Sequence, residues 1–177
     1  KKIVIALKTE QGYQLIDAVN SKKLDTVKKN SIVKIRTNNS LRIDIRAILA
    51  KKKLTSSNIQ VRQNAIKEIL KTVKPALLPA LKQAQQKEKE TSILDSINLA
   101  IALIDLESAD NIVRIHAVKI LASSLHPIAS NKLTELVATN DKGEYLEGNK
   151  EIISIATNGI KQIGYKRSFY SKLETLF

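Results

Sequence analysis

Two stretches of the chain, 52 residues apart, carry the same residue pattern, and this recurrence restricts the fold more than any other sequence feature. Each copy reads Val-Arg-x-x-Ala-x-x-x-Ile or Leu, followed by a proline and a leucine. The matched pairs are Val61 and Val113, Arg62 and Arg114, Ala65 and Ala117, Ile69 and Leu121, Pro75 and Pro127, and Leu81 and Leu133. Because self-similarity at a fixed period is typical of repeat proteins, we expect stacked helical units.

Helical spacing of apolar residues begins near residue 39. The expected inner face of the first helix consists of Leu41, Ile45, Ile48 and Leu49. A helix predicted from about residue 92 to 106 returns 59 residues later, so an insertion separates the two copies. That insertion is the polar loop 140–149, and the repeat units are predicted at about 59–106 and 111–164.

These patterns predict a mainly α fold, a solenoid of about six to eight helices over residues 39–165. The Val-Arg-x-x-Ala pattern resembles HEAT repeats. Ser56, Ser57 or Asn58 is expected to cap one repeat helix and Asp110 the next. Arg62 and Arg114 recur in the same frame, which favours a structural role, such as pairing with a neighbouring repeat or a helix C-terminus.

Residues 1–38 have strand character instead. Short β-branched or alternating runs predict strands at 2–7, 13–17 and 31–36, with a turn at residues 20–23. A small β-hairpin or meander is therefore expected ahead of the helices.

The residue inventory argues against an enzyme. The chain has no Cys and only two His, His116 and His126, so thiolate catalysis and ordinary zinc sites are excluded, and each histidine is expected to be a surface or cap residue. No glycine-rich phosphate loop is present. We therefore expect no catalytic residues, no cofactor and no metal.

Positive charge is concentrated in residues 28–72, where twelve Lys or Arg oppose only Asp44 and Glu68. Lys51, Lys52, Lys53 and Arg62 form the candidate basic patch. A solvated lysine-rich face, a nucleic-acid site and a site for anionic lipid are three readings of this charge. The segment has no aromatic side chain, which makes base extrusion a poor fit.

Four segments together resemble the N-terminal region of the permease subunit of the bacterial urea ABC transporter. They are Tyr13–Ala18 (Tyr-x-Leu-x-Asp-Ala), Ile35–Arg42 (Ile-Arg-x-Asn-Asn-x-Leu-Arg), the repeat with Pro75–Leu81, and the basic, aromatic end Lys166–Phe177. Within the second segment, Arg36, Asn38, Asn39 and Arg42 form a candidate interaction or junction motif, for which we favour a role in holding the fold.

The resemblance implies an accessory protein-interaction domain on the extracytoplasmic (periplasmic) side of the bacterial inner membrane, within an integral membrane protein of the branched-chain amino acid permease type. It implies other transporter subunits as partners, including the periplasmic substrate-binding protein. Residues 166–177 would lead into a membrane helix, and the chain, which lacks Met, would be part of a longer protein. The alternative is a soluble, basic HEAT-like nucleic-acid-binding domain.

Overall fold

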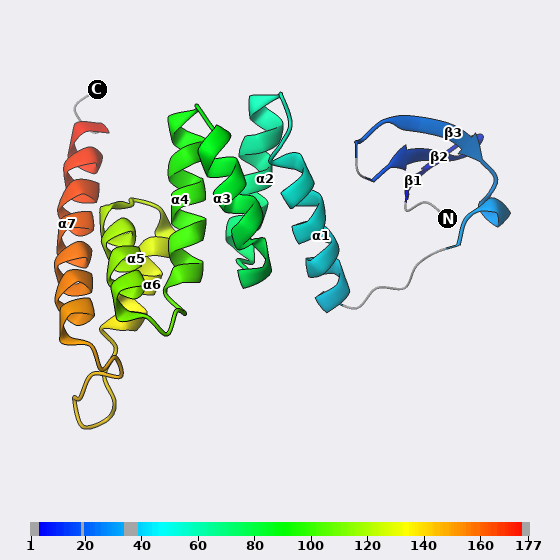
Figure 1. The fold of residues 1–177 in the computed structure, drawn as a ribbon. Coiled ribbons are helices and arrows are strands. Elements are labelled where there is room, and N and C mark those ends of the chain that lie inside the picture. Colours follow the sequence, from blue (N-terminus) through cyan, green and yellow to red (C-terminus); the bar gives the residue numbers. More distant parts are fainter. Residues whose placement is uncertain (1–3, 19, 34–38, 175–177) are drawn as a thin grey trace. The chain divides into compact units, whose positions relative to one another are not determined.

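The computed structural model describes residues 4–18, 20–33 and 39–174, in which a small antiparallel sheet precedes seven α-helices (Figure 1). The mainly helical class and the N-terminal sheet are therefore confirmed. The strands are β1 (Val4–Thr9), β2 (Gly12–Asp17) and β3 (Lys23–Val27), and a short 3-10 helix, η1, follows at Lys29–Ser31. The helices are α1 (Asn39–Lys53), α2 (Ile59–Lys71), α3 (Leu78–Lys87), α4 (Thr91–Asp105), α5 (Asn111–Ser123), α6 (Pro127–Leu136) and α7 (Lys150–Glu174), with a second 3-10 helix, η2 (Pro75–Leu77), ahead of α3.

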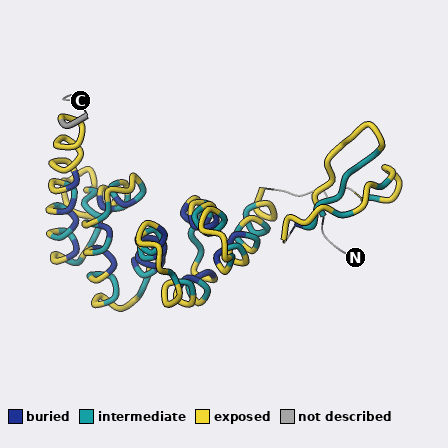
Figure 2. Tube along the Cα trace, turned by 90° about the horizontal axis from the view of Figure 1, so that it is seen from above, coloured by how far each residue is buried: buried dark blue, intermediate teal, exposed yellow. Residues whose placement is uncertain are grey.

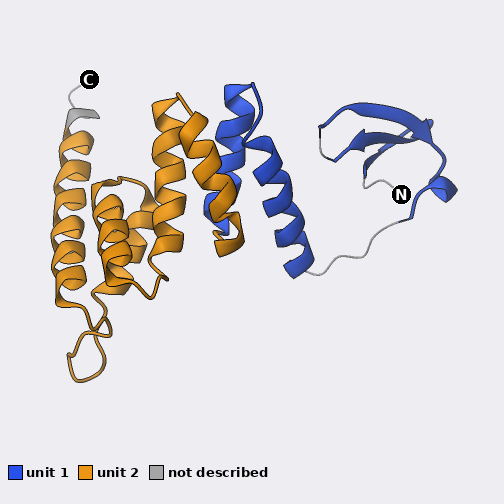
Figure 3. Ribbon diagram, viewed as in Figure 1, with its two compact units in different colours: residues 1–72 blue, residues 73–177 orange. Residues whose placement is uncertain are grey.

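The chain divides into two compact units, Lys1–Thr72 and Val73–Phe177, called unit 1 and unit 2 (Figure 3). The division falls between α2 and η2, within the stretch 59–106 that the sequence marks as one repeat. Unit 1 therefore holds the sheet, α1 and α2, whereas unit 2 holds α3 to α7.

The sheet of unit 1 has the order β1-β2-β3, with Ile5 opposite Ile16 and Tyr13 opposite Val27. The first two strands lie close to their predicted positions. The prediction of the third strand at 31–36 is wrong where it can be compared: the strand lies at Lys23–Val27, Ser31 belongs to η1, and residues 34–36 lie outside the described residues. A tight turn, in which the Ser21 N–H donates to the Asp17 carbonyl, sends the chain straight back along β2.

Helix α1 begins at Asn39, where helical spacing begins in the sequence, and packs against α2. Half of its predicted inner face is wrong, because Leu41 is 42% and Ile48 is 65% exposed, whereas Ile45 and Leu49 are half-buried. Ala50 and Leu54 are buried instead. Ile43, Ala47, Ala50 and Leu54 follow at i, i+4, i+7 and i+11, so they form a second apolar face beside the predicted one.

Unit 2 contains an aliphatic core centred on α4. This helix packs against α3 and α5, and α5 in turn packs against α6 and α7. Ile93, Ile97 and Ala100 of α4 have no exposed surface. Figure 2 colours buried residues dark blue, and such residues recur along the helices of this unit. Helix α7 approaches α5 so closely that a Cβ on Gly159 would lie 2.6 Å from the Ala122 Cβ, so glycine is required there for space.

The 52-residue recurrence is visible in the local structure. Helices α2 and α5 are both 13 residues long and begin 52 residues apart. Pro75 and Pro127 stand at the first position of the helical segments that follow, where a missing N–H costs nothing. None of the described helices combines the length and the apolar character that crossing a bilayer requires.

Candidate functional site

The candidate junction motif is only partly described. Arg36 and Asn38 lie outside the described residues. Asn39 is the first residue of α1, and Arg42 lies exposed one turn further along the same helix. The structure therefore places two of the four residues on one helical turn, at the point where the sequence predicts that the helices begin.

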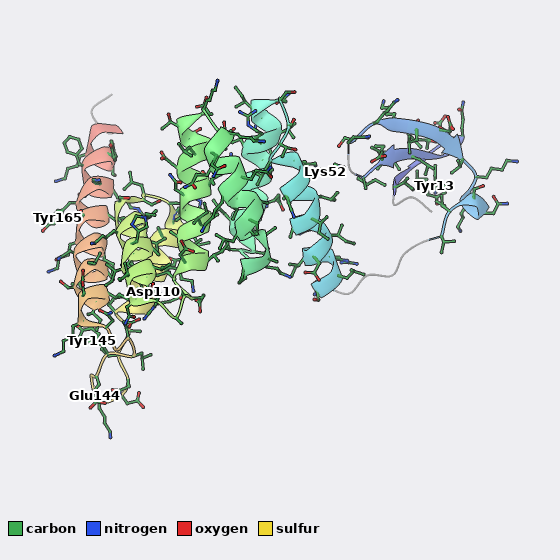
Figure 4. The ribbon with its side chains drawn as sticks, in the orientation of Figure 1. Tyr13, Lys52, Asp110, Glu144, Tyr145 and Tyr165 are labelled. Carbon is green, nitrogen blue, oxygen red and sulfur yellow. The ribbon has the colours of Figure 1, made fainter. Side chains whose placement is uncertain are left out.

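The candidate basic patch separates into two parts. Lys51, Lys52 and Lys53 form the last turn of α1, where positive charge interacts favourably with the unpaired carbonyls of a helix C-terminus. Lys51 and Lys52 are exposed, and Lys53 is half-buried. Lys52 is labelled in Figure 4. Of the four patch residues, Lys51 and Lys52 are therefore the two whose charge is exposed.

Arg62 has a structural environment. Its Nη1 donates to the Ser56 carbonyl at 3.0 Å and to the Ser57 carbonyl at 3.1 Å. In the same loop, Asn58 Oδ1 accepts from the Val61 N–H at 3.3 Å and caps α2. Arg62 therefore ties the α1–α2 loop to the start of α2, as expected for a structural arginine.

Glu68 of α2 is the acidic group within this basic region. A hydrogen bond from Lys71, supported by the charges of Lys71, Arg46 and Lys53, lowers the pKa of Glu68 despite some desolvation. Part of the positive charge of α1, on Arg46 and Lys53, thus acts on α2 within unit 1.

Charge differs sharply between the two units. Unit 1 carries seventeen Lys or Arg against five Asp or Glu, a net charge of +12, whereas unit 2 carries thirteen against twelve, a net charge of +1. An electrostatic partner of this chain would therefore meet its field mainly at unit 1.

A second cluster, in unit 2, joins Arg114 to the insertion. Arg114 Nε donates to the Leu106 carbonyl at 3.2 Å, at the C-terminal end of α4, and Arg114 Nη2 pairs with Glu147 Oε2. The side chains of Arg114 and Glu147 are only 21% and 10% exposed. The bond to a helix C-terminus confirms the structural role expected of Arg114, but the sequence did not indicate Glu147 as its partner.

Glu147 also positions the start of α7. Its Oε1 accepts from the Asn149 N–H at 2.8 Å, and Asn149 Oδ1 accepts from the N–H groups of Glu151 and Ile152. Burial, the largest single influence, raises the pKa of Glu147, but the bonds from Asn149 and Arg114 together outweigh it and lower the pKa. The carboxylate therefore connects α5, the insertion and the N-terminus of α7.

The insertion itself is an ordered hairpin. The Leu146 N–H donates to the Ala138 carbonyl at 2.9 Å, and the Asn140 N–H donates to the Glu144 carbonyl at 2.8 Å. Tyr145 and Leu146 are 53% and 70% exposed (Figure 4). A shallow, open depression adjoins Tyr145, along Lys150, Ile153, Ser154, Thr157 and Asn158 of α7.

The remaining titratable candidates are structural. Asp110 Oδ1 accepts from the Ile112 N–H at 2.8 Å, and His126 Nδ1 accepts from the Ile128 N–H at 3.2 Å, so both residues cap helices as predicted. His116 is exposed on α5. Across the described part of the chain, no three His, Asp or Glu residues gather closely enough to hold a metal ion.

Surface charge and helix packing are the features that distinguish the described residues. The resemblance to the urea permease depends on sequence motifs alone. Comparison with protein families, with curated proteins and with solved structures finds no match to this chain.

Proposed function

We propose that this chain is a HEAT-like α-solenoid that binds a protein partner and performs no catalysis. The observation that carries the proposal is the repetition of local structure at an offset of 52 residues. Asn58 and Asp110 cap helices of equal length, and each cap donates its own N–H to a serine two residues earlier. Both helices also end on the same bond, from Thr72 N–H to the Ile69 carbonyl and from Ser124 N–H to the Leu121 carbonyl.

Repeats of this kind are stabilised by their neighbours, which gives a direct test of the solenoid. Ile66 and Ile69 of α2 are each only 1% exposed. Native-state hydrogen exchange should therefore protect the amides of α2 as strongly as those of α5. Exchange of α2 at the rate of a frayed terminal helix would contradict a continuous solenoid.

The specific setting that we propose is the extracytoplasmic part of a urea ABC importer's permease subunit. The motifs of residues 13–18, 35–42 and 75–81 support it, as does the start of α1 at Asn39, within the second motif. In this setting the lysine cluster at residues 51–53 would face an acidic surface of a transporter subunit or of the periplasmic substrate-binding protein.

Sequencing the gene on both sides of the chain is the first test of that setting. A run of roughly 18 or more apolar residues soon after Phe177 would support it. A polar continuation ending in a stop codon would exclude it. If the run is present, urea uptake by the intact transporter carrying Lys51→Gln, Lys52→Gln and Lys53→Gln should fall, whereas the same change at Lys82, Lys87 and Lys89 of unit 2 should leave uptake unchanged.

The net charge of +12 on unit 1 favours nucleic acid as a second candidate partner. Such binding would weaken in proportion to the logarithm of the salt concentration, because bound lysines release counterions. A titration with duplex and single-stranded DNA at two salt concentrations distinguishes the proposals. Negligible binding at low salt removes this candidate.

A further inference from the structure

Helix α7 continues well beyond the part that packs against its neighbours. Ile163 is 2% exposed, and the nine residues that follow it, 164–172, are all exposed. At about 1.5 Å per residue, this end of the helix runs for roughly 13 Å without being covered. Because isolated helical turns are marginal in water, such an extension is typical of a segment that contacts another surface.

The aromatic residues of the chain gather on this extension. The core is aliphatic, and of the six Phe and Tyr residues in the sequence, three lie within residues 164–172. Tyr165 is 77%, Phe169 61% and Tyr170 53% exposed, and Tyr165 lies on the side of α7 opposite α5 (Figure 4). Large apolar side chains clustered in the open commonly mark an interaction site.

Positive charge accompanies the aromatic rings. Residues 152–173 contain no Asp or Glu but carry Lys161, Lys166, Arg167 and Lys172. The rest of unit 2 has nine basic and twelve acidic residues, so this stretch is where the positive charge of unit 2 is concentrated. Lys161, Tyr165, Phe169 and Lys172 follow at i, i+4, i+8 and i+11, a spacing that places them on one helical face.

We propose that residues 161–172 of α7 bind the surface of a bilayer that contains anionic phospholipid. Aromatic rings are suited to the interface because each has an apolar body, and in tyrosine also a polar end. Lysines beside them reach the phosphates while their methylene chains lie along the apolar region. A purely electrostatic contact would account for the charge but not for three exposed rings beside the cations, whereas a bilayer interface accommodates both.

Unit 2 is arranged to hold this face in position. Arg167 Nη2 donates to the Leu125 carbonyl at 3.1 Å, which fastens the extension to the α5–α6 connection. Exposed rings and lysines along one side suit a helix that lies in the interface plane. The inference depends on the surface of α7 alone and stands whether or not the chain belongs to a transporter.

A single tryptophan can test the contact, because the chain contains none. Phe169→Trp places the reporter in the proposed contact, and Tyr145→Trp places a control on the exposed hairpin of the same unit. With vesicles of phosphatidylcholine and phosphatidylglycerol, emission at position 169 should shift to the blue, and emission at 145 should not. No shift at 169, or equal shifts at both positions, overturns the proposal.

The contribution of unit 1 to lipid binding must be distinguished from that of α7, because both regions are positively charged and attract anionic lipid. Lys161→Gln, Lys166→Gln and Lys172→Gln together should lower the partition coefficient roughly a hundredfold, from the usual attraction per lysine near such a surface. The charge-matched control, Lys51→Gln, Lys52→Gln and Lys53→Gln, should lower it only a few-fold. A control that weakens binding as much as the α7 variant would assign binding to unit 1 and overturn the proposal.

The aromatic contribution is tested at constant charge. Tyr165→Ser with Phe169→Ser should reduce partitioning about tenfold or more, because apolar burial contributes to interfacial binding. Far-UV circular dichroism checks that α7 remains helical; if it does not, the tryptophan reporter, which keeps an aromatic ring, decides. Unchanged partitioning by a folded double variant would show that the rings are not used.

Discussion

Units 1 and 2 differ in the number of apolar side chains that they bury and in their net charge. Among the described residues, seven buried apolar side chains belong to unit 1 and nineteen to unit 2. The net charges run the other way, +12 against +1. In the sheet of unit 1, Ile5 and Leu7 are about half exposed, whereas α4 of unit 2 is buried along most of its length.

This difference indicates that unit 2 mainly provides stability and that unit 1 mainly provides surface charge. Unit 2 buries more apolar surface, and this burial stabilises its fold. Unit 1 buries less and carries more like charge, so we expect it to contribute less to the stability of the chain. Charge of one sign destabilises a small domain through self-repulsion, and an anionic partner would relieve that repulsion. The predictions that follow test this division, beginning with the largest effect.

Leu133→Ala should cause the largest loss of stability. Leu133 of α6 has no exposed surface, and its Cδ1 lies next to Gly159 of α7. A buried leucine truncated in this way typically costs about 3 kcal/mol, from lost transfer free energy and the cavity left behind. The control, Leu7→Ala in the half-exposed sheet, should cost less than about 1 kcal/mol. Denaturant unfolding of both variants measures the difference, and equal losses would mean that the units are equally well packed.

Glu147→Gln should cost about 2 kcal/mol near neutral pH, because the amide keeps the size of the side chain but loses a charged bond to Arg114. The control in unit 1 is Glu68→Gln, whose partner Lys71 is 67% exposed. That substitution should cost only a few tenths of a kcal/mol, as for other surface pairs.

The stability of the native protein and that of the Glu147→Gln variant should also depend differently on pH. The pKa of Glu147 is lowered in the folded state, so its stabilisation is complete above the ordinary value of 4.5 and is lost as the pH falls through the folded pKa. Below that folded pKa, native and Glu147→Gln proteins should unfold at similar denaturant concentrations. A stability difference that persisted there would show that the carboxylate charge is not responsible.

Helices and caps could be predicted from the sequence because their causes are local. The helical spacing, the prolines and the cap residues Asn58 and Asp110 each act within a few residues, and the structure confirms them. The repeated Arg114 likewise signalled a bond to a helix end. Such features depend on short-range sterics and hydrogen bonds, which the residue order specifies directly.

Pairing between distant residues could not be predicted in the same way. On α1, two faces of apolar residues compete, and only the packing on α2 decides that Ala50 and not Ile48 is buried. β3 is polar and exposed, so alternation marked residues 31–36 more strongly than the actual strand. Glu147 lies 33 residues from Arg114, a separation at which no periodic signal relates two residues.

Two glycines of α7 should respond in opposite directions to alanine. At Gly164 nothing lies within 4 Å of an added Cβ, so Gly164→Ala should stabilise the protein by about 1 kcal/mol through helix propensity. At Gly159 an added Cβ would lie 3.0 Å from the Ala122 Cα, which cannot easily move. Overpacking there should outweigh the propensity gain and leave Gly159→Ala about 1 kcal/mol less stable. Stabilisation by both substitutions would mean that α5 and α7 can separate slightly, and that the core of unit 2 is looser than the burial implies.

The smallest expected effect is a difference between the two helix caps. Asn58→Ala in unit 1 and Asp110→Ala in unit 2 should each cost about 1 kcal/mol, because each leaves one helical N–H without its acceptor. If the two helices are equivalent parts of one repeat, the two losses should agree within about 0.5 kcal/mol, and hydrogen exchange at α2 and α5 should rise by similar factors. A large loss of stability in Asp110→Ala with almost none in Asn58→Ala would show that α2 and α5 do not contribute equally to the stability of the fold. The sequence period would then reflect only a common helix pattern, and stability would lie in unit 2 alone.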